Sequence, residues 1–280
     1  MNAVVVLANK TTLSRDLWPE DISVLQSERT LTAESLPSSR IVPLDEDQIA
    51  SWVCVDMQPE LGQALVYVRQ DDVASGSSLA GESVELLVRV QGVVQDINLS
   101  VGGDWDGTLP NAMRACQNIT LAGGGCHDAF DPQVKCLRSL RSVVLRALGK
   151  SVVGDGRRDK DTLSLQRRVF TKIRVGVNDS LSSLLKKEED PKGKFREIER
   201  TWRVTERVLV ASHTANGEIR RVHPLAVRKG DMVDVAVRIV VAFRGGKHYD
   251  VYYEPTTVVR VSDHQRVGVR VFYCLRGRLA

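Results

Sequence analysis

The sequence predicts an α+β fold in which β-structure dominates. We expect a C-terminal antiparallel barrel or sandwich, preceded by a mixed N-terminal region with an amphipathic helix. Apolar and polar side chains alternate with a period of two through much of residues 166–276, which is typical of strands with one buried face. Residues 132–148 instead repeat apolar side chains at spacings of three and four, as one buried helix face does. Aromatic residues make up only 5% of the chain, so Val and Leu must supply most of the core.

The 280-residue chain suits one large β-type domain or two domains of ordinary size. We expect an acidic, mixed α/β region over residues 1–150 and a basic antiparallel β domain over residues 162–280. Residues 151–161 (SVVGDGRRDKD) separate them and have the composition of a linker.

The elements expected in the first region follow from turn and cap residues. Pro and acidic residues suit a first helical turn, and a two-residue turn with Gly between β-rich runs favours a hairpin. In chain order, we expect a short apolar segment at Ala3–Leu7, a short helix opening at Trp18–Asp21, a strand at Leu61–Gln70, a hairpin over Val84–Val101 that turns at Gln91-Gly92, and a helix from Pro110 to about Ile119.

The clearest helix in the sequence is predicted over Pro132–Leu148, after a Gly-rich break at Ala122–Cys126. Its buried stripe consists of Val134, Leu137, Leu140, Val144 and Leu148. Gly149 stands where a helix C-cap is expected.

Beyond the linker the pattern predicts mostly strands. They cover Gln166–Val177, Trp202–Val210, Met232–Phe243, Tyr249–Val261 and Arg266–Arg276, with a short exposed helix at Leu181–Asp190. Residues 244–247 (RGGK) form the expected turn between two of these strands. A five-stranded barrel or sandwich would close such a set.

Charge is divided unevenly along the chain. Residues 1–130 carry 7 Lys and Arg against 18 Asp and Glu, whereas residues 131–280 carry 32 against 17. The two parts therefore have net charges of −11 and +15, although the whole chain has only +4. A basic excess of this kind favours a polyanionic partner, unless the acidic part covers the basic part within one molecule.

The outward faces of the predicted strands are the candidate binding surface. Guanidinium groups neutralise phosphates, and aromatic rings give unstacked bases a platform. The alternative is that these residues merely form the charged outer face that a soluble sheet needs. The candidate nucleic-acid-binding residues are Arg168, Phe170, Lys172, Arg174, Arg203, Arg207, Arg266, Arg270 and Phe272.

The sequence offers no motif for catalysis, a metal or a cofactor. Cys116, Cys126, His127 and Cys136 are residue types that bind zinc, but they contain no closely spaced Cys pair. Three glycines at 123–125 lack the Gly-Lys-Ser/Thr of a phosphate-binding loop. A hydrolase elbow motif, G-x-S-x-G, is absent. We therefore expect a non-enzymatic protein without a metal or cofactor, and an enzyme with a non-motif site stays open.

The sequence also bears on location. No stretch reaches the roughly 20 apolar residues that span a bilayer, and the start of the chain lacks the features of a secretory signal. Five cysteines are too few and too scattered for a disulfide scaffold. We expect an intracellular protein, cytoplasmic or nuclear.

The run Arg228-Lys229-Gly230-Asp231-Met232-Val233-Asp234-Val235, followed by Thr257–Val261, resembles a feature of uncharacterised proteins from mushroom-forming fungi. The resemblance covers about the last fifth of the chain and implies no activity and no functional residue.

Together these observations predict a binding protein whose basic β-sheet face contacts RNA or single-stranded DNA. The alternative is a self-assembling structural protein of the viral coat, matrix or movement type. In that case the acidic part of one copy would meet the basic part of the next and form a homo-oligomer.

Overall fold

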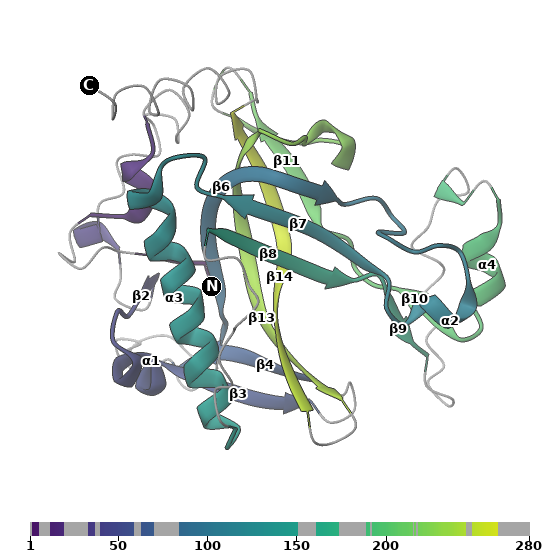
Figure 1. The fold of residues 1–280 in the computed structure, drawn as a ribbon, viewed down its shortest axis with the longest axis horizontal. Coiled ribbons are helices and arrows are strands. Elements are labelled where there is room, and N and C mark those ends of the chain that lie inside the picture. Colours follow the sequence, from purple (N-terminus) through teal and green to yellow (C-terminus); the bar gives the residue numbers. More distant parts are fainter. Residues whose placement is uncertain are drawn as a thin grey trace, which may run out of the picture.

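A computed structural model describes residues 2–5, 12–19, 33–36, 40–58, 63–69, 84–150, 161–173, 189–190, 192–214, 216, 218–244 and 248–262. These residues confirm the predicted α+β fold with dominant β-structure (Figure 1). The strands are β1 (Asn2–Val5), β2 (Ile41–Val42), β3 (Val53–Gln58), β4 (Gln63–Val68), β5 (Val84–Glu85), β6 (Leu87–Asn98), β7 (Cys116–Ala122), β8 (Thr162–Arg168), β9 (Phe170–Lys172), β10 (Trp202–Val204), β11 (Leu209–His213), β12 (Ile219–Arg221), β13 (Met232–Arg244) and β14 (His248–Ser262). The helices are α1 (Glu46–Trp52), α2 (Leu109–Ala112), α3 (His127–Ala147) and α4 (Lys194–Ile198), with 3-10 turns at η1 (Ser14–Leu17), η3 (Ala33–Ser35) and η6 (Pro224–Ala226).

Five strands form a partly open barrel around the main core. The long, curved strand β6 belongs to two ladders, because residues 87–93 pair with β13 and residues 93–98 pair with β7. β7 also pairs with β8, and β14 pairs with β13. β8 lies against β14, although among the described residues no backbone ladder joins them. The resulting order, β6-β7-β8-β14-β13, is that of an OB-fold, a partly open five-stranded barrel.

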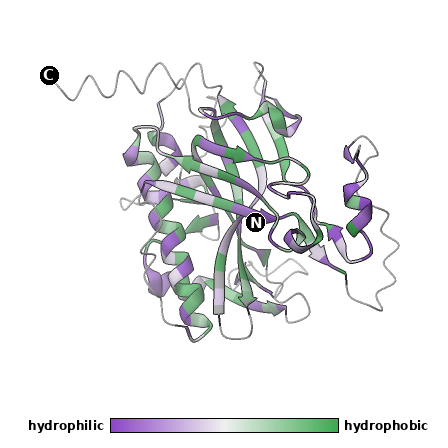
Figure 2. Ribbon diagram, turned by 45° about the vertical axis from the view of Figure 1, so that its right-hand side comes forward, coloured by the Kyte–Doolittle hydropathy of each residue, from purple (hydrophilic) through white to green (hydrophobic). Residues whose placement is uncertain are grey.

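The sheet is mixed, and it joins both charge regions of the chain. β13 from the basic region pairs with β6 and β4 from the acidic region. β1 runs parallel to β6 and β2, and β11 runs parallel to β14. Figure 2 shows hydrophobic and hydrophilic residues alternating along the strands, as a sheet with a buried face requires.

Helix α3 packs on the barrel through the predicted stripe. Leu137, Leu140 and Val144 are fully buried, and Gly149 follows the helix with a φ of 68°, which confirms the predicted C-cap. The helix begins at His127, five residues before the predicted start. The Tyr253 hydroxyl of β14 donates to the carbonyl of Leu137 at 2.8 Å and ties the helix to the far side of the barrel.

A side chain of α3 repairs a gap in the sheet. β6 pairs with β1 up to Arg89 and with β7 from Val93, so Gln91 lies between these two neighbours. The Gln133 amide oxygen accepts from the Gln91 backbone N–H at 2.7 Å, and its nitrogen donates to the Gln91 carbonyl at 3.2 Å. Buried backbone groups need such partners, so Gln133 takes the place of a missing strand.

A small second unit, which we call the arm, extends beyond the end of β8 (Figure 1). It consists of α2, β9, α4 and β10, and among the described strands β9 pairs only with β10. Its own apolar cluster contains Phe170 and Ile198, with Trp105 and Phe195 packed against them. The Trp105 and Phe170 rings meet edge to face, with centroids 5.0 Å apart.

The predicted hairpin over Val84–Val101 is wrong, because Leu87–Asn98 form one continuous strand through Gly92. A Cβ at Gly92 would lie 3.0 Å from Cβ of Leu121 and 3.0 Å from Cε2 of Phe130. Gly92 therefore allows α3 and β7 to approach β6 closely, and does not turn the chain.

One predicted helix is also corrected. After Pro110, only Leu109–Ala112 are helical, and Cys116–Ala122 form β7 because they pair with β6 on one side and β8 on the other. The helix predicted to open at Trp18–Asp21 would run through residues 20–32, which lie outside the described residues; Trp18 itself is extended and buried after the 3-10 turn η1.

The later strands are confirmed in part. Met232–Phe243 and Tyr249–Val261 form the β13–β14 pair, and Leu61–Gln70 contains β4. The predicted Trp202–Val210 strand is instead split into β10 and β11, which belong to different sheets. Residues 151–160, 174–188, 245–247 and 266–276 lie outside the described residues, and with them most of the predicted linker, the predicted helix before Pro191 and the predicted last strand.

Candidate nucleic-acid interface

The outer face of β7 and β8 is a polar surface that leads to the arm. β8 alternates strictly: Leu163, Leu165 and Arg167 are buried, and the residues between them are exposed. The facing pairs on the outer side are Cys116 with Arg168, Asn118 with Gln166, and Thr120 with Ser164. In an OB-fold this face and the adjoining loops are where oligonucleotides bind.

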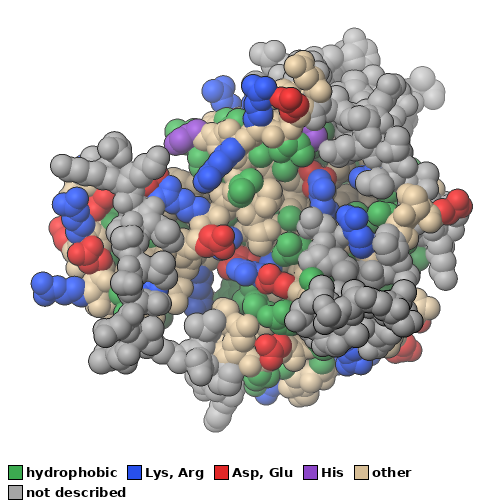
Figure 3. Space-filling view, turned by 180° about the vertical axis from the view of Figure 1, so that it is seen from behind, with side chains coloured by type: hydrophobic (Ala, Val, Ile, Leu, Met, Phe, Trp, Pro, Cys, Tyr) green, Lys and Arg blue, Asp and Glu red, His purple; other side chains and the backbone are tan. Residues whose placement is uncertain are grey.

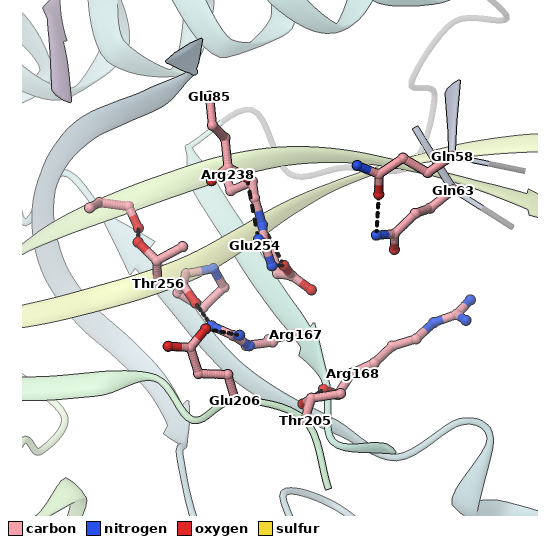
Figure 4. Close-up of polar contacts among 12 residues, drawn as sticks. Gln58, Gln63, Glu85, Arg167, Arg168, Thr205, Glu206, Arg238, Glu254 and Thr256 are labelled. Atoms are coloured by element: carbon pink, nitrogen blue, oxygen red, sulfur yellow. Dashed lines mark hydrogen bonds and ion pairs between the residues drawn. The ribbon is translucent and has the colours of Figure 1, made fainter. Parts of the chain in front are cut away.

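Arg168 ends this face and is exposed, as predicted. The Thr205 hydroxyl donates to the Arg168 carbonyl at 2.7 Å and so fixes the backbone there. In Figure 4 the Arg168 side chain extends away from Arg167, its neighbour in sequence. Lys172 is also exposed, at the outer end of β9, where it pairs with Trp202 of β10.

Phe170 does not belong to the outer surface, so this prediction is corrected. Its side chain is only 3% exposed and packs with Trp105 and Phe195 in the core of the arm. The alternation of β8 breaks at Val169, because Val169 and Phe170 are both buried where the chain leaves the barrel for the arm. Phe170 therefore offers no ring on which a base could stack.

Two further candidates are partly buried. Arg207 donates to both carboxylate oxygens of Glu189, at 2.5 and 2.6 Å, so its charge is neutralised within the molecule. Arg203 lies on β10 and is half-buried. The remaining candidates lie outside the described residues: Arg174, Arg266, Arg270 and Phe272.

The arm presents further cations that strand periodicity did not identify. Lys194, Arg196 and Arg200 are exposed in and after α4. Glu197 and Glu199 lie between Arg196 and Arg200, so this segment carries charges of both signs. A five-residue helix has no periodicity long enough to mark its outer face in the sequence.

A partly buried ionic network underlies the end of β8 (Figure 4). Arg238 of β13 binds Glu254 through two of its nitrogens and Glu85 through a third, at 3.3 Å. The carboxylates of Glu254 and Glu85 offset the burial of Arg238, and the net effect is a raised pKa. Arg167 is buried nearby, and burial lowers its pKa. Sequence periodicity placed Arg167 on no functional face.

Figure 3 shows the face of the molecule opposite to that in Figure 1. Near its centre, Lys and Arg side chains lie next to Asp and Glu side chains, so the described surface there is not a continuous basic patch. Ion pairs of this kind are present among the described residues, as in Arg238 with Glu85 and with Glu254.

The zinc-type residues named in the sequence do not form a metal site among the described residues. No three His, Cys, Asp or Glu side chains there are close enough to hold a metal ion, so Cys116, Cys126, His127 and Cys136 are not brought together. Burial raises the pKa of the Cys136 thiol to about 12. No described helix is both long and apolar enough to cross a bilayer.

No family model and no curated protein matches this chain. Among solved structures, a C-terminally truncated single-stranded DNA-binding protein from bacteriophage Enc34 is 12% identical, with a TM-score of 0.33, over 75% of this chain and 95% of that chain. The same phage protein in complex with ssDNA is 14% identical, with a TM-score of 0.33 and the same coverage. At these values the likeness supports no inference about this chain. The resemblance to fungal proteins stays a prediction.

Proposed function

We propose that this protein binds single-stranded nucleic acid along the outer face of β7 and β8 and onto the arm. The observation that carries the proposal is the strand order of the barrel, which leaves this polar face exposed and ends it at Arg168. OB-folds bind single strands on the corresponding face, and this step rests on fold analogy.

The described residues favour phosphate contact over base stacking. Arg168 and Lys172 are exposed, whereas Phe170 is buried and Trp105 is packed against it. The polar side chains of Asn118 and Gln166 offer donors and acceptors to sugars and base edges. Binding should therefore tolerate many sequences and weaken with added salt, since each phosphate contact releases counterions.

Fluorescence anisotropy with labelled 20-nucleotide strands of DNA and RNA tests this proposal. At about 50 mM salt we expect saturable binding, with a slope of log K against log salt that is smaller by about 0.7 in Arg168→Glu. The affinity of this variant should fall roughly three- to tenfold. Lys135→Glu is the matched control. Lys135 is exposed on α3, so this substitution makes the same change of charge away from the proposed face.

Absence of binding to both strands at this salt concentration would refute the proposal. Equal loss of affinity in Arg168→Glu and Lys135→Glu would refute the location of the interface, since it would show a response to net charge alone.

A further inference from the structure

Arg167 is buried but poorly partnered. Its residue is 5% exposed, and its Nη1 donates to the Pro255 carbonyl of β14 at a long 3.4 Å. Its Nη2 lies 3.8 Å from the Glu206 carboxylate, beyond hydrogen-bond distance, and its Nε is buried without a partner among the described residues. A guanidinium has five N–H donors, and burying a charge without strong partners is costly.

The neighbouring Arg238 shows what a satisfied guanidinium looks like in the same network. It donates to Glu254 through Nε at 2.9 Å and also through Nη2, and its Nη1 reaches Glu85 at 3.3 Å. These carboxylates lie near Arg167 as well, but they are engaged by Arg238. Within this network, the incomplete bonding is therefore a feature of Arg167 and not of Arg238.

Glu206 is the one carboxylate paired with Arg167 among the described ion pairs, and it is loosely held. Its side chain is 88% exposed, so its charge stays hydrated and can move at little cost. Figure 4 shows the two side chains pointing toward each other, Arg167 from β8 and Glu206 from outside that strand. The pair lies where β8 and β14 are adjacent, with no ladder between them among the described residues, and the exposed Arg168 follows Arg167 on the opposite side of β8.

We propose that Arg167 is a phosphate-binding residue and that Glu206 is a displaceable carboxylate that pairs with it until a phosphate arrives. A phosphate brings several acceptor oxygens and can take two parallel N–H···O bonds from the guanidinium, which Glu206 at 3.8 Å does not. The inference rests on the proposed function and adds to it a phosphate contact at the end of β8, on the side of the strand opposite to the Arg168 side chain.

The first test compares Glu206→Gln with Asp47→Asn by anisotropy with the 20-nucleotide DNA. Both substitutions remove one exposed negative charge, but Asp47 lies on α1, outside the proposed interface, and has no ion pair with Arg167 among the described contacts. We expect Glu206→Gln to tighten binding roughly three- to tenfold and to steepen the salt slope by about 0.7, because one more phosphate is neutralised. In an Arg167→Lys background the gain should disappear, since lysine lacks the planar fork.

The second test uses inorganic phosphate and follows the Nε–Hε NMR signal of Arg167, assigned by its loss in Arg167→Lys. We expect this signal to shift with phosphate, and to shift at lower phosphate in Glu206→Gln. Binding of DNA strands with and without a 5′-phosphate then distinguishes a terminal from an internal phosphate. If Glu206→Gln changes the affinity for both strands equally, the phosphate at Arg167 is an internal one.

The outcomes separate the two proposals. If DNA and RNA fail to bind but phosphate still shifts the Arg167 signal, the proposed function is wrong and the phosphate site stands. If the strands bind but Glu206→Gln behaves like Asp47→Asn, and phosphate leaves the Arg167 signal unmoved, the phosphate site is wrong. Because Glu206 is exposed, Glu206→Gln should fold normally, so the comparison with this variant remains valid even if Arg167→Lys does not fold.

Discussion

Replacing Gln133 by Met should destabilise the protein, because it breaks the hydrogen bonds that join helix α3 to strand β6. Met has nearly the same length and shape but cannot hydrogen-bond to the backbone. The substitution leaves the Gln91 N–H and carbonyl, now bonded at 2.7 and 3.2 Å, without their side-chain partner in a buried setting. Each unsatisfied buried group costs about 1 to 3 kcal/mol, and the removal of a buried amide returns part of that. We expect a net loss of about 2 to 4 kcal/mol.

Urea unfolding followed by circular dichroism measures this loss. For a chain of this size, the same change should lower the melting temperature by about 4 to 12 °C. Gln166→Met is the matched control, because Gln166 is exposed on β8 and the substitution there should stay within about 0.5 kcal/mol. If both variants unfold at the same urea concentration, Gln133 does not replace a missing strand, and our account of the gap in the sheet is wrong.

Three further predictions follow from packing and burial. Gly92→Ala should cost about 1 to 3 kcal/mol by overpacking, because its Cβ would meet Leu121 and Phe130 at 3.0 Å; unchanged urea unfolding would contradict this. Phe170→Ala removes a buried ring from the arm and should cost its local structure about 3 to 5 kcal/mol. Hydrogen exchange in β9 and β10 should then accelerate, and exchange at the wild-type rate would refute the assignment of Phe170 to the core. The Cys136 thiol, with its pKa raised to about 12 by burial, has only about one thiolate in ten thousand at pH 8. Mass spectrometry should therefore find Cys136 unmodified by iodoacetamide in the folded protein at pH 8 and modified in urea.

The sequence predicted those parts of the fold that depend on local periodicity. The stripe of α3 and the alternation of β13 span many residues, so their buried faces can be read without knowing what covers them. Gly92 shows the opposite case. Its meaning depends on Leu121 and Phe130, which are distant in sequence, so a Gly that permits close packing could not be told from a Gly that turns the chain.

The candidate site was predictable only as far as strand alternation continued. Arg168 lies on the outer face because β8 alternates up to that point. At Val169 the chain leaves the barrel, and Phe170 enters the core of the arm, which no local pattern indicates. Arg207 pairs with Glu189, which lies 18 positions away in a region without regular periodicity. The sequence therefore could not show that the charge of Arg207 is neutralised.

The uneven charge of the chain is partly resolved inside the fold. Ion pairs join cations of residues 131–280 to carboxylates of residues 1–130: Arg146 with Glu46, Lys229 with Asp96, and Arg238 with Glu85. The first two are largely exposed and add little stability, but each still lowers the positive potential of the basic region. Among the described ion pairs, none engages Arg168 or Lys172. The positive surface at the end of β8 and on the arm, where we propose that a polyanion binds, therefore carries only part of the net charge of +15 of residues 131–280.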